Sequence, residues 1–114
     1  MKQASKASAY IGHNYGVHEW SDQTVYNAVS RALVAQGIDG ATFTPCVGMW
    51  RGELEQTTRC DCYGVSVDAF RAAMEQTAQE LAQWEILIDF DDRAETVGND
   101  PSARRATLER CAVA

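Results

Sequence analysis

The chain has 114 residues, of which 46% are hydrophobic and 23% are charged, and this length and composition suit one soluble domain with a single core. The formal net charge of −6 argues against a surface of clustered Lys and Arg, so no nucleic-acid partner is expected. No apolar stretch approaches the roughly 20 residues that cross a bilayer, and residues 1–8 lack the apolar segment of a secretory signal, so we expect a cytoplasmic protein without a membrane partner.

The first part of the chain predicts a strand and then an amphipathic helix. Residues 1–8 are expected to form a flexible N-terminus, and residues 9–13 a short strand. Ser21 is suited to cap a helix over residues 22–36, and Gly37 to end it. Apolar residues recur along this helix with helical spacing, and they are Val25, Ala28, Val29, Ala32 and Leu33.

The middle of the chain predicts a β-hairpin. Residues 41–50 and residues 57–65 have the composition of strands, and residues 51–56 form the turn between them. Pro45 cannot donate a backbone hydrogen bond, so it predicts an edge position or a bulge. Alternation along the first strand sets Phe43, Val47 and Met49 on one face and Thr42, Thr44, Cys46 and Trp50 on the other.

The last part predicts a second helix, a strand and a polar tail. Asp68 is suited to cap a helix that runs to about residue 83, and residues 85–90 form a strand. Residues 91–114 are polar and weakly patterned, although Asp100-Pro101 has the form of a cap that allows a short helix over residues 102–111. The apolar stripe of the second helix comprises Phe70, Ala73, Met74, Thr77, Ala78 and Leu81.

The resulting order is β-α-β-β-α-β within a single domain over residues 9–90. It predicts an α+β fold of the ferredoxin-like type, in which two helices cover one face of a four-stranded antiparallel sheet. The other sheet face is then bare and apolar enough to require a partner, most simply copies of the same chain. The residues expected there include Tyr10, Cys46, Trp50, Leu87 and either Tyr63 or its neighbours.

The four cysteines do not predict a metal site. Cys60 and Cys62 form one close pair, but Cys46 and Cys111 stand alone, so the second close pair of a zinc template is missing. Residues two apart on a strand share a face, and small buried side chains are the simpler interpretation of this pair. We expect neither a metal nor a cofactor.

The turn of the hairpin is the strongest candidate for a ligand site. Trp50 offers an indole face, Arg51 can hold an anionic group, and Gly52 lets a ligand approach the backbone. Glu53 and Glu55 share a side if the strand has begun, and they could neutralise a cation or bind ribose hydroxyls. Each residue alone also has an ordinary structural explanation, but their joint occurrence favours a site.

Two residues at the end of the first strand could add polar contacts to that ligand, and they are His13 and Asn14. The chain contains no Gly-rich phosphate loop, no G-x-S-x-G elbow and no H-E-x-x-H motif. A binding site made of side chains on the hairpin is therefore the prediction.

The element order and the Gly-x-aromatic-basic step into the hairpin resemble PII-like trimeric proteins and, more narrowly, bacteriophage S-adenosylmethionine lyases, formerly described as hydrolases. The similarity runs from Tyr10 to about Phe90, and it includes the second helix and residues 37–40, 48–51, 55–62 and 84–88. The resemblance implies a PII-like homotrimer with the active site between subunits. It gives no match for the polar tail.

The same resemblance implies an activity and site residues. In that family a Tyr and a Glu on the hairpin are important; Glu55 matches the Glu, whereas Trp50 stands at the position of the Tyr and lacks its hydroxyl. The implied reaction cleaves S-adenosyl-L-methionine to 5′-methylthioadenosine and L-homoserine lactone in the host cytoplasm, which lowers the methyl donor and counters restriction. The alternative is a non-catalytic PII-like trimer that binds or sequesters an adenine nucleotide or a related signal.

Overall fold

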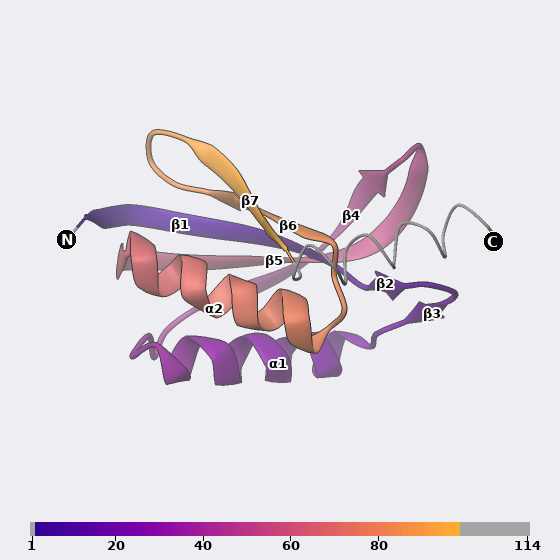
Figure 1. Cartoon of the computed structure of the whole chain (residues 1–114), viewed down its shortest axis with the longest axis horizontal. Helices are drawn as coiled ribbons and strands as arrows, with labels where there is room; N and C mark the ends of the chain where they lie inside the picture. Colours follow the sequence, from indigo (N-terminus) through magenta and orange to yellow (C-terminus); the bar gives the residue numbers. More distant parts are fainter. Residues whose placement is uncertain (1, 99–114) are drawn as a thin grey trace.

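A computed structural model describes residues 2–98 of the chain, and these residues form seven strands and two helices. Figure 1 shows the helices packed side by side beneath the long strands. In chain order the elements are β1 (Gln3–Gly12), β2 (Asn14–Tyr15), β3 (His18–Glu19), α1 (Asp22–Ala35), β4 (Thr42–Trp50), β5 (Glu53–Ser66), α2 (Val67–Glu80), β6 (Glu85–Asp89) and β7 (Ala94–Gly98).

The main sheet has five antiparallel strands in the order β4-β5-β1-β6-β7. The predicted α+β class and the β-α-β-β-α-β core are present, but the prediction of four strands is wrong. The fifth strand, β7, lies in the segment that the sequence suggested was an unpatterned tail. It pairs with β6 along its whole length, from Glu85 opposite Gly98 to Asp89 opposite Ala94.

Long-range contacts explain why β7 is a strand despite its polar sequence. Only Val97 of its five residues is buried, so the strand shows little of the apolar alternation that sequence analysis detects. Glu95 receives hydrogen bonds from Arg71 on α2, with Nε and Nη2 as the two donors, and this pair ties β7 to the helix. The rest of the predicted tail, including the proposed helix over residues 102–111, lies outside the described residues.

The first strand is also longer than the alternation indicated. β1 begins at Gln3 rather than at residue 9, and it pairs with β5 from Gln3 opposite Ser66 onward. Asp91 helps to hold this early part of β1, because its carboxylate accepts backbone hydrogen bonds from Ser5 (2.6 Å) and Lys6 (3.0 Å). These hydrogen bonds lower the pKa of Asp91 below its ordinary value.

Both helices begin at a serine whose side chain accepts a backbone N–H of the first turn. Ser21 accepts from Thr24 at 3.1 Å, as predicted, and Ser66 accepts from Ala69 at 3.2 Å. The predicted cap Asp68 instead lies inside the first turn of α2, where it pairs with Arg71. The predicted apolar stripes of both helices are buried.

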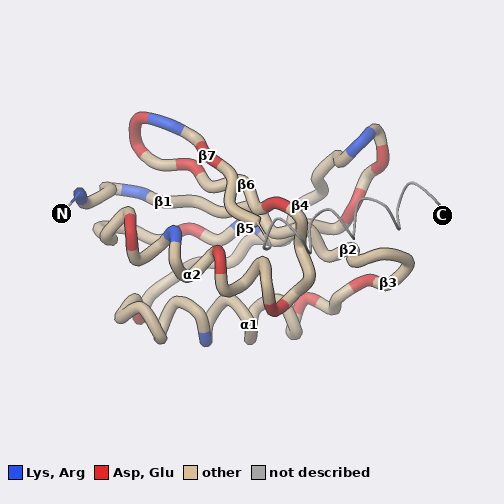
Figure 2. Tube along the Cα trace, viewed as in Figure 1, with Lys and Arg blue, Asp and Glu red and all other residues tan. Residues whose placement is uncertain are grey.

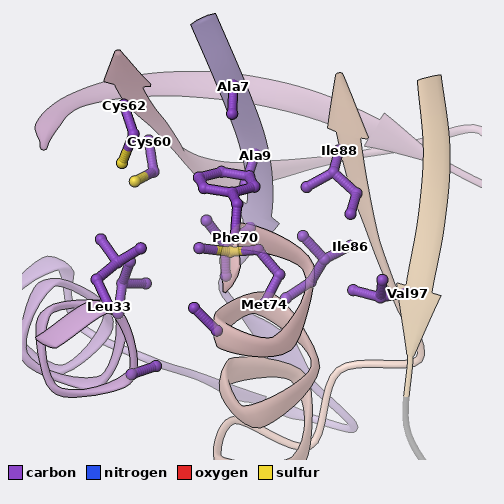
Figure 3. Close-up of a cluster of buried hydrophobic side chains, with 14 of the residues drawn as sticks. Ala7, Ala9, Leu33, Cys60, Cys62, Phe70, Met74, Ile86, Ile88 and Val97 are labelled. Atoms are coloured by element: carbon purple, nitrogen blue, oxygen red, sulfur yellow. The ribbon is translucent and has the colours of Figure 1, made fainter. Parts of the chain in front are cut away.

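The core lies between these stripes and one face of the sheet (Figure 3). Small residues on β1, Ala7 and Ala9, let the ring of Phe70 approach the sheet closely, and both Cys60 and Cys62 are buried beside them. A hydrogen bond with Cys62, together with burial, raises the pKa of Cys60 above its ordinary value. The Cys60 thiol therefore stays protonated and packs as a small apolar group, as the sequence predicted.

The β4–β5 hairpin projects beyond the helices at one end of the molecule (Figure 1). Pro45 lies on β4, which is an edge strand, and this confirms the prediction of an edge position. The turn is tighter than predicted, because β5 begins at Glu53 and only two residues connect the strands. Arg51 (φ 52°) and Gly52 (φ 81°) both have positive φ, the geometry of a type I′ hairpin turn.

Neither helix of residues 2–98 combines the length and apolar character needed to span a bilayer.

The sheet face opposite the helices carries partly exposed large side chains, which are Trp50, Tyr63 and Leu87. The predicted bare face is therefore present in the described chain.

Candidate functional site

A cavity of about 860 Å³ lies on the bare face of the sheet, at the end where the hairpin projects. Its volume falls within the range of pockets that hold small molecules. The hairpin, the end of β1, β2 and the loop before β6 all contribute residues. The main polar and aromatic lining residues are Tyr10, Asn14, Tyr15, Trp50, Arg51, Glu53, Glu55, Arg59, Trp84 and Glu85.

Glu55 is held at the floor of this cavity. Its side chain leans over Gly12 of β1, and the backbone N–H of Asn14 donates a hydrogen bond to Glu55 Oε2 at 3.2 Å. The backbone carbonyl of Glu55 accepts a hydrogen bond from the Thr57 hydroxyl at 3.3 Å. The carboxylate thus has a defined position while it still borders the cavity.

An aromatic and cationic cluster forms one wall. The rings of Trp50 and Trp84 meet edge to face, with centroids 6.0 Å apart. The guanidinium carbon of Arg51 lies 4.6 Å from the centroid of Trp84 and 5.6 Å from that of Trp50. Among residues 2–98 no carboxylate pairs with Arg51, so its N–H donors are available to an anionic group of a ligand while the indoles hold the side chain.

The lining charges suit a ligand that carries both signs. Three carboxylates, on Glu53, Glu55 and Glu85, and two guanidinium groups, on Arg51 and Arg59, border the cavity. Figure 2 shows basic and acidic positions following one another along the β4–β5 hairpin. A zwitterionic molecule with a cationic centre and an anionic end could therefore pair with both kinds of group.

Arg59 is oriented by a small polar cluster on the bare face. Its Nε lies 3.1 Å from the Asp61 carboxylate, and its guanidinium carbon lies 5.9 Å from the ring centroid of Tyr10. Asp61 is largely buried and also accepts a hydrogen bond from the Ser8 hydroxyl. Burial raises the pKa of Asp61, but the hydrogen bonds from Ser8 and Arg59 outweigh that effect, and the pKa lies below its ordinary value.

Acid should weaken the fold partly through Asp61. Because its folded-state pKa is depressed, the carboxylate stabilises the fold above its unfolded pKa of about 4, and this contribution is lost as pH falls through the folded value. We expect Asp61→Asn to lower the free energy of unfolding at pH 7 by about 2 kcal/mol. The difference between variant and native protein should shrink below about pH 4. Urea unfolding at pH 7 and pH 3 measures it, and a constant difference would contradict this role.

His13 does not belong to the cavity, contrary to the prediction that it binds a ligand. It is fully buried, because the β2–β3 hairpin and the start of α1 close over it. Its Nδ1 lies 2.9 Å from the carbonyl oxygen of Trp20, so Nδ1 carries the proton and donates. Its Nε2 lies 2.7 Å from the Thr58 hydroxyl. Both ring nitrogens serve the fold, and neither can reach a ligand.

His13→Ala should therefore affect stability rather than ligand binding directly. The change leaves a partly buried carbonyl and a buried hydroxyl without their His13 partner and creates a cavity, which together cost about 3 kcal/mol. We expect a clearly lower melting temperature by calorimetry. Ligand affinity measured well below that temperature should stay close to the native value. A selective loss of affinity in a folded variant would show that His13 contributes to ligand binding.

The structure brings most of the predicted site residues together. Asn14, Trp50, Arg51, Glu53 and Glu55 all line the cavity. Gly52 does not line it, because this residue sits at the tip of the turn, where its positive φ gives it a backbone role.

Gly12, Arg59 and Trp84 are among the lining residues that sequence reasoning did not assign to the site. Strand alternation could have found Arg59, since it shares a face with Glu55. Trp84 reaches the cavity from the loop after α2, and no local sequence pattern predicts that contact.

Within the described residues no group of His, Cys, Asp and Glu side chains could hold a metal ion.

Comparisons with known proteins agree with this architecture. No protein-family model and no curated protein matches the sequence. A phage SAM lyase in its apo state has a TM-score of 0.72 and 17% sequence identity over 84% of this chain and 90% of that chain. A phage SAM lyase in complex with S-methyl-5′-thioadenosine has a TM-score of 0.65 and 17% identity over 82% and 88%. The chain is therefore similar in fold to phage SAM lyases, which confirms at the level of fold the resemblance seen in the sequence.

Proposed function

We propose that this chain is a lyase that cleaves S-adenosyl-L-methionine to S-methyl-5′-thioadenosine and L-homoserine lactone. The observation that carries the proposal is the cavity on the bare sheet face, which Glu55 lines together with two indoles and two guanidinium groups in a fold similar to that of phage SAM lyases. One of those neighbours is in complex with S-methyl-5′-thioadenosine, the thioether product of this reaction.

The reaction is intramolecular and needs neither water nor a proton donor. An oxygen of the substrate carboxylate attacks the γ-carbon of the methionyl chain. The bond between that carbon and sulfur breaks, and its electron pair goes to sulfur, so the sulfonium becomes a neutral thioether. Closing the chain into this reactive shape is the main barrier, and a site that holds it closed accelerates the step by orientation.

The lining residues match these requirements. Glu55 complements the sulfonium or the ribose hydroxyls, and Trp50 and Trp84 offer faces for the adenine or the cation. Arg51 can hold an anionic group of the substrate. One carboxylate near the sulfonium is a suitable complement, because stronger stabilisation of the ground-state cation would slow its loss.

We further propose a PII-like homotrimer in which the bare sheet faces contact neighbouring subunits around the site. Support comes from the partly exposed apolar residues on that face and from the exposed hairpin residues Val47, Met49 and Leu54. Light scattering of the purified chain tests the trimer independently of activity.

In a phage-infected cell the activity would lower the host's methyl donor in the cytoplasm and counter restriction.

The activity is tested by incubating the pure protein with S-adenosylmethionine and separating the products. Spontaneous decay also yields methylthioadenosine, so the protein must exceed a protein-free control. In ¹⁸O-water, direct hydrolysis labels the homoserine hydroxyl, whereas opening of the lactone at its carbonyl labels the carboxylate. We expect methylthioadenosine formation with label in the carboxylate only. Tight binding without turnover would instead select the alternative, a PII-like trimer that sequesters an adenine nucleotide or a related signal.

A further inference from the structure

Two glycines form part of the cavity floor, and both are required by space rather than by backbone conformation. Gly12 and Gly48 line the cavity, and neither has positive φ. A Cβ added at Gly12 would lie 2.6 Å from Glu55 Oε1 and 2.8 Å from its Cδ. A Cβ added at Gly48 would lie 2.7 Å from Thr57 Oγ1. A side chain from β5 therefore fills the space above each glycine.

The contact at Gly12 works together with a hydrogen bond at Asn14. The N–H of Asn14 donates to Glu55 Oε2 at 3.2 Å, and its carbonyl accepts from Gln83 Nε2 at 2.9 Å. Gln83 is buried and also donates to the carbonyl of Leu81. The hydrogen bond from Gln83 thus helps to hold the Asn14 backbone in place, so the N–H that binds the carboxylate has a defined position.

We infer that Gly12 is the positioning residue for the Glu55 carboxylate, in an inference that rests on the proposed lyase function. The missing side chain at Gly12 admits the carboxylate to the floor, and the Asn14 N–H fixes one of its oxygens there. The clash at Gly12 involves the far end of a flexible side chain, so an added methyl group should displace the carboxylate before it displaces the sheet.

Gly12→Ala tests the inference, with Gly40→Ala as the matched control. A Cβ at Gly40 meets no atom within 4 Å, and the backbone there does not have positive φ. Displacement of a reacting group by about 1 Å can cost 10²-fold in rate. We therefore expect Gly12→Ala to lower kcat by about 100-fold while KM changes much less. Gly40→Ala should keep native kinetics, and equal kinetics for both variants would overturn the inference.

A second readout does not depend on lyase activity. In NMR spectra, the Asn14 amide proton should shift in response to Glu55→Gln in the native background, because the variant removes the charged acceptor of its hydrogen bond. In Gly12→Ala that response should be lost or strongly reduced. A native response in Gly12→Ala would overturn the inference even if turnover fell. Absence of turnover in the native protein would remove the proposed function while the NMR result still decides the positioning.

Double variants separate positioning from general damage. Glu55→Gln should lower turnover far less in the Gly12→Ala background than in the native chain, because the carboxylate is already misplaced. If Gly12→Ala alone fails to fold, adding Glu55→Ala removes the clashing side chain and should restore folding, as circular dichroism would show. A double variant that stays unfolded would overturn the inference.

Discussion

Glu55→Gln is expected to lower the turnover of S-adenosylmethionine by at least about 100-fold, because it removes the one carboxylate held at the cavity floor. The amide has nearly the same shape, so the fold and the oligomer should survive. The loss should appear in kcat, because Glu55 is proposed to help hold the substrate in its reactive shape, whereas the aromatic contacts to the substrate remain. Product formation measured by chromatography under saturating substrate gives the value.

Glu75→Gln is the matched control for that experiment. Glu75 is exposed on α2, whose buried face packs on the sheet side opposite the cavity. This variant makes the same chemical change without touching the site, and it should keep native turnover. Native turnover in Glu55→Gln would remove the site assignment even with the lyase activity established.

Trp84→Ala is expected to weaken the binding of methylthioadenosine by roughly 10- to 100-fold, since an aromatic stacking partner contributes about 1–3 kcal/mol per base. The indole lies 4.6 Å from the guanidinium carbon of Arg51, so its loss also frees Arg51 from one of its two aromatic neighbours. Trp84→Phe keeps a ring and should recover most of the affinity. Calorimetry with methylthioadenosine measures all three proteins.

Val34→Ala controls for the removal of an apolar side chain away from the site. Val34 lies on α1, is 65% exposed and does not line the cavity. Its removal should leave the affinity for methylthioadenosine unchanged. Equal affinity for Trp84→Ala and the native chain would show that the aromatic wall is not the adenine subsite.

The position of Trp50 explains how the site can depart from the family pattern. The resemblance aligns Trp50 with a tyrosine, whose hydroxyl the indole lacks. In the structure Trp50 packs edge to face on Trp84 and close to Arg51, so its ring supports the cationic cluster. We therefore propose a binding role for Trp50, and Glu55 remains the residue expected to act on the reacting atoms.

The parts of the fold with strong local patterns were predictable. Both apolar helical stripes are buried, and Ser21 caps α1, because helical periodicity and caps are determined within one or two turns of chain. β7 was missed because its five residues include one buried side chain, and its stability depends on β6 and on the pair between Arg71 and Glu95. The early part of β1 depends in the same way on Asp91.

The site residues fall into the same two groups, those predictable from nearby sequence and those that depend on distant contacts. Residues within the hairpin, Trp50, Arg51, Glu53 and Glu55, could be grouped because strand alternation and a short turn keep them on one face. His13 looked like a polar loop residue, yet its environment is made by Trp20 and Thr58, which a local pattern does not reveal.

The sequence by itself determined the order of the core elements, the buried helix faces and the unusual hairpin, since each depends on residues close together along the chain. The tertiary structure decided which distant residues complete the cavity. It brought Trp84 to Arg51, and it set Gly12 of β1 beneath Glu55 of β5. Such contacts depend on strand order and register, which arise when the whole sheet forms, and for that reason a single segment cannot encode them.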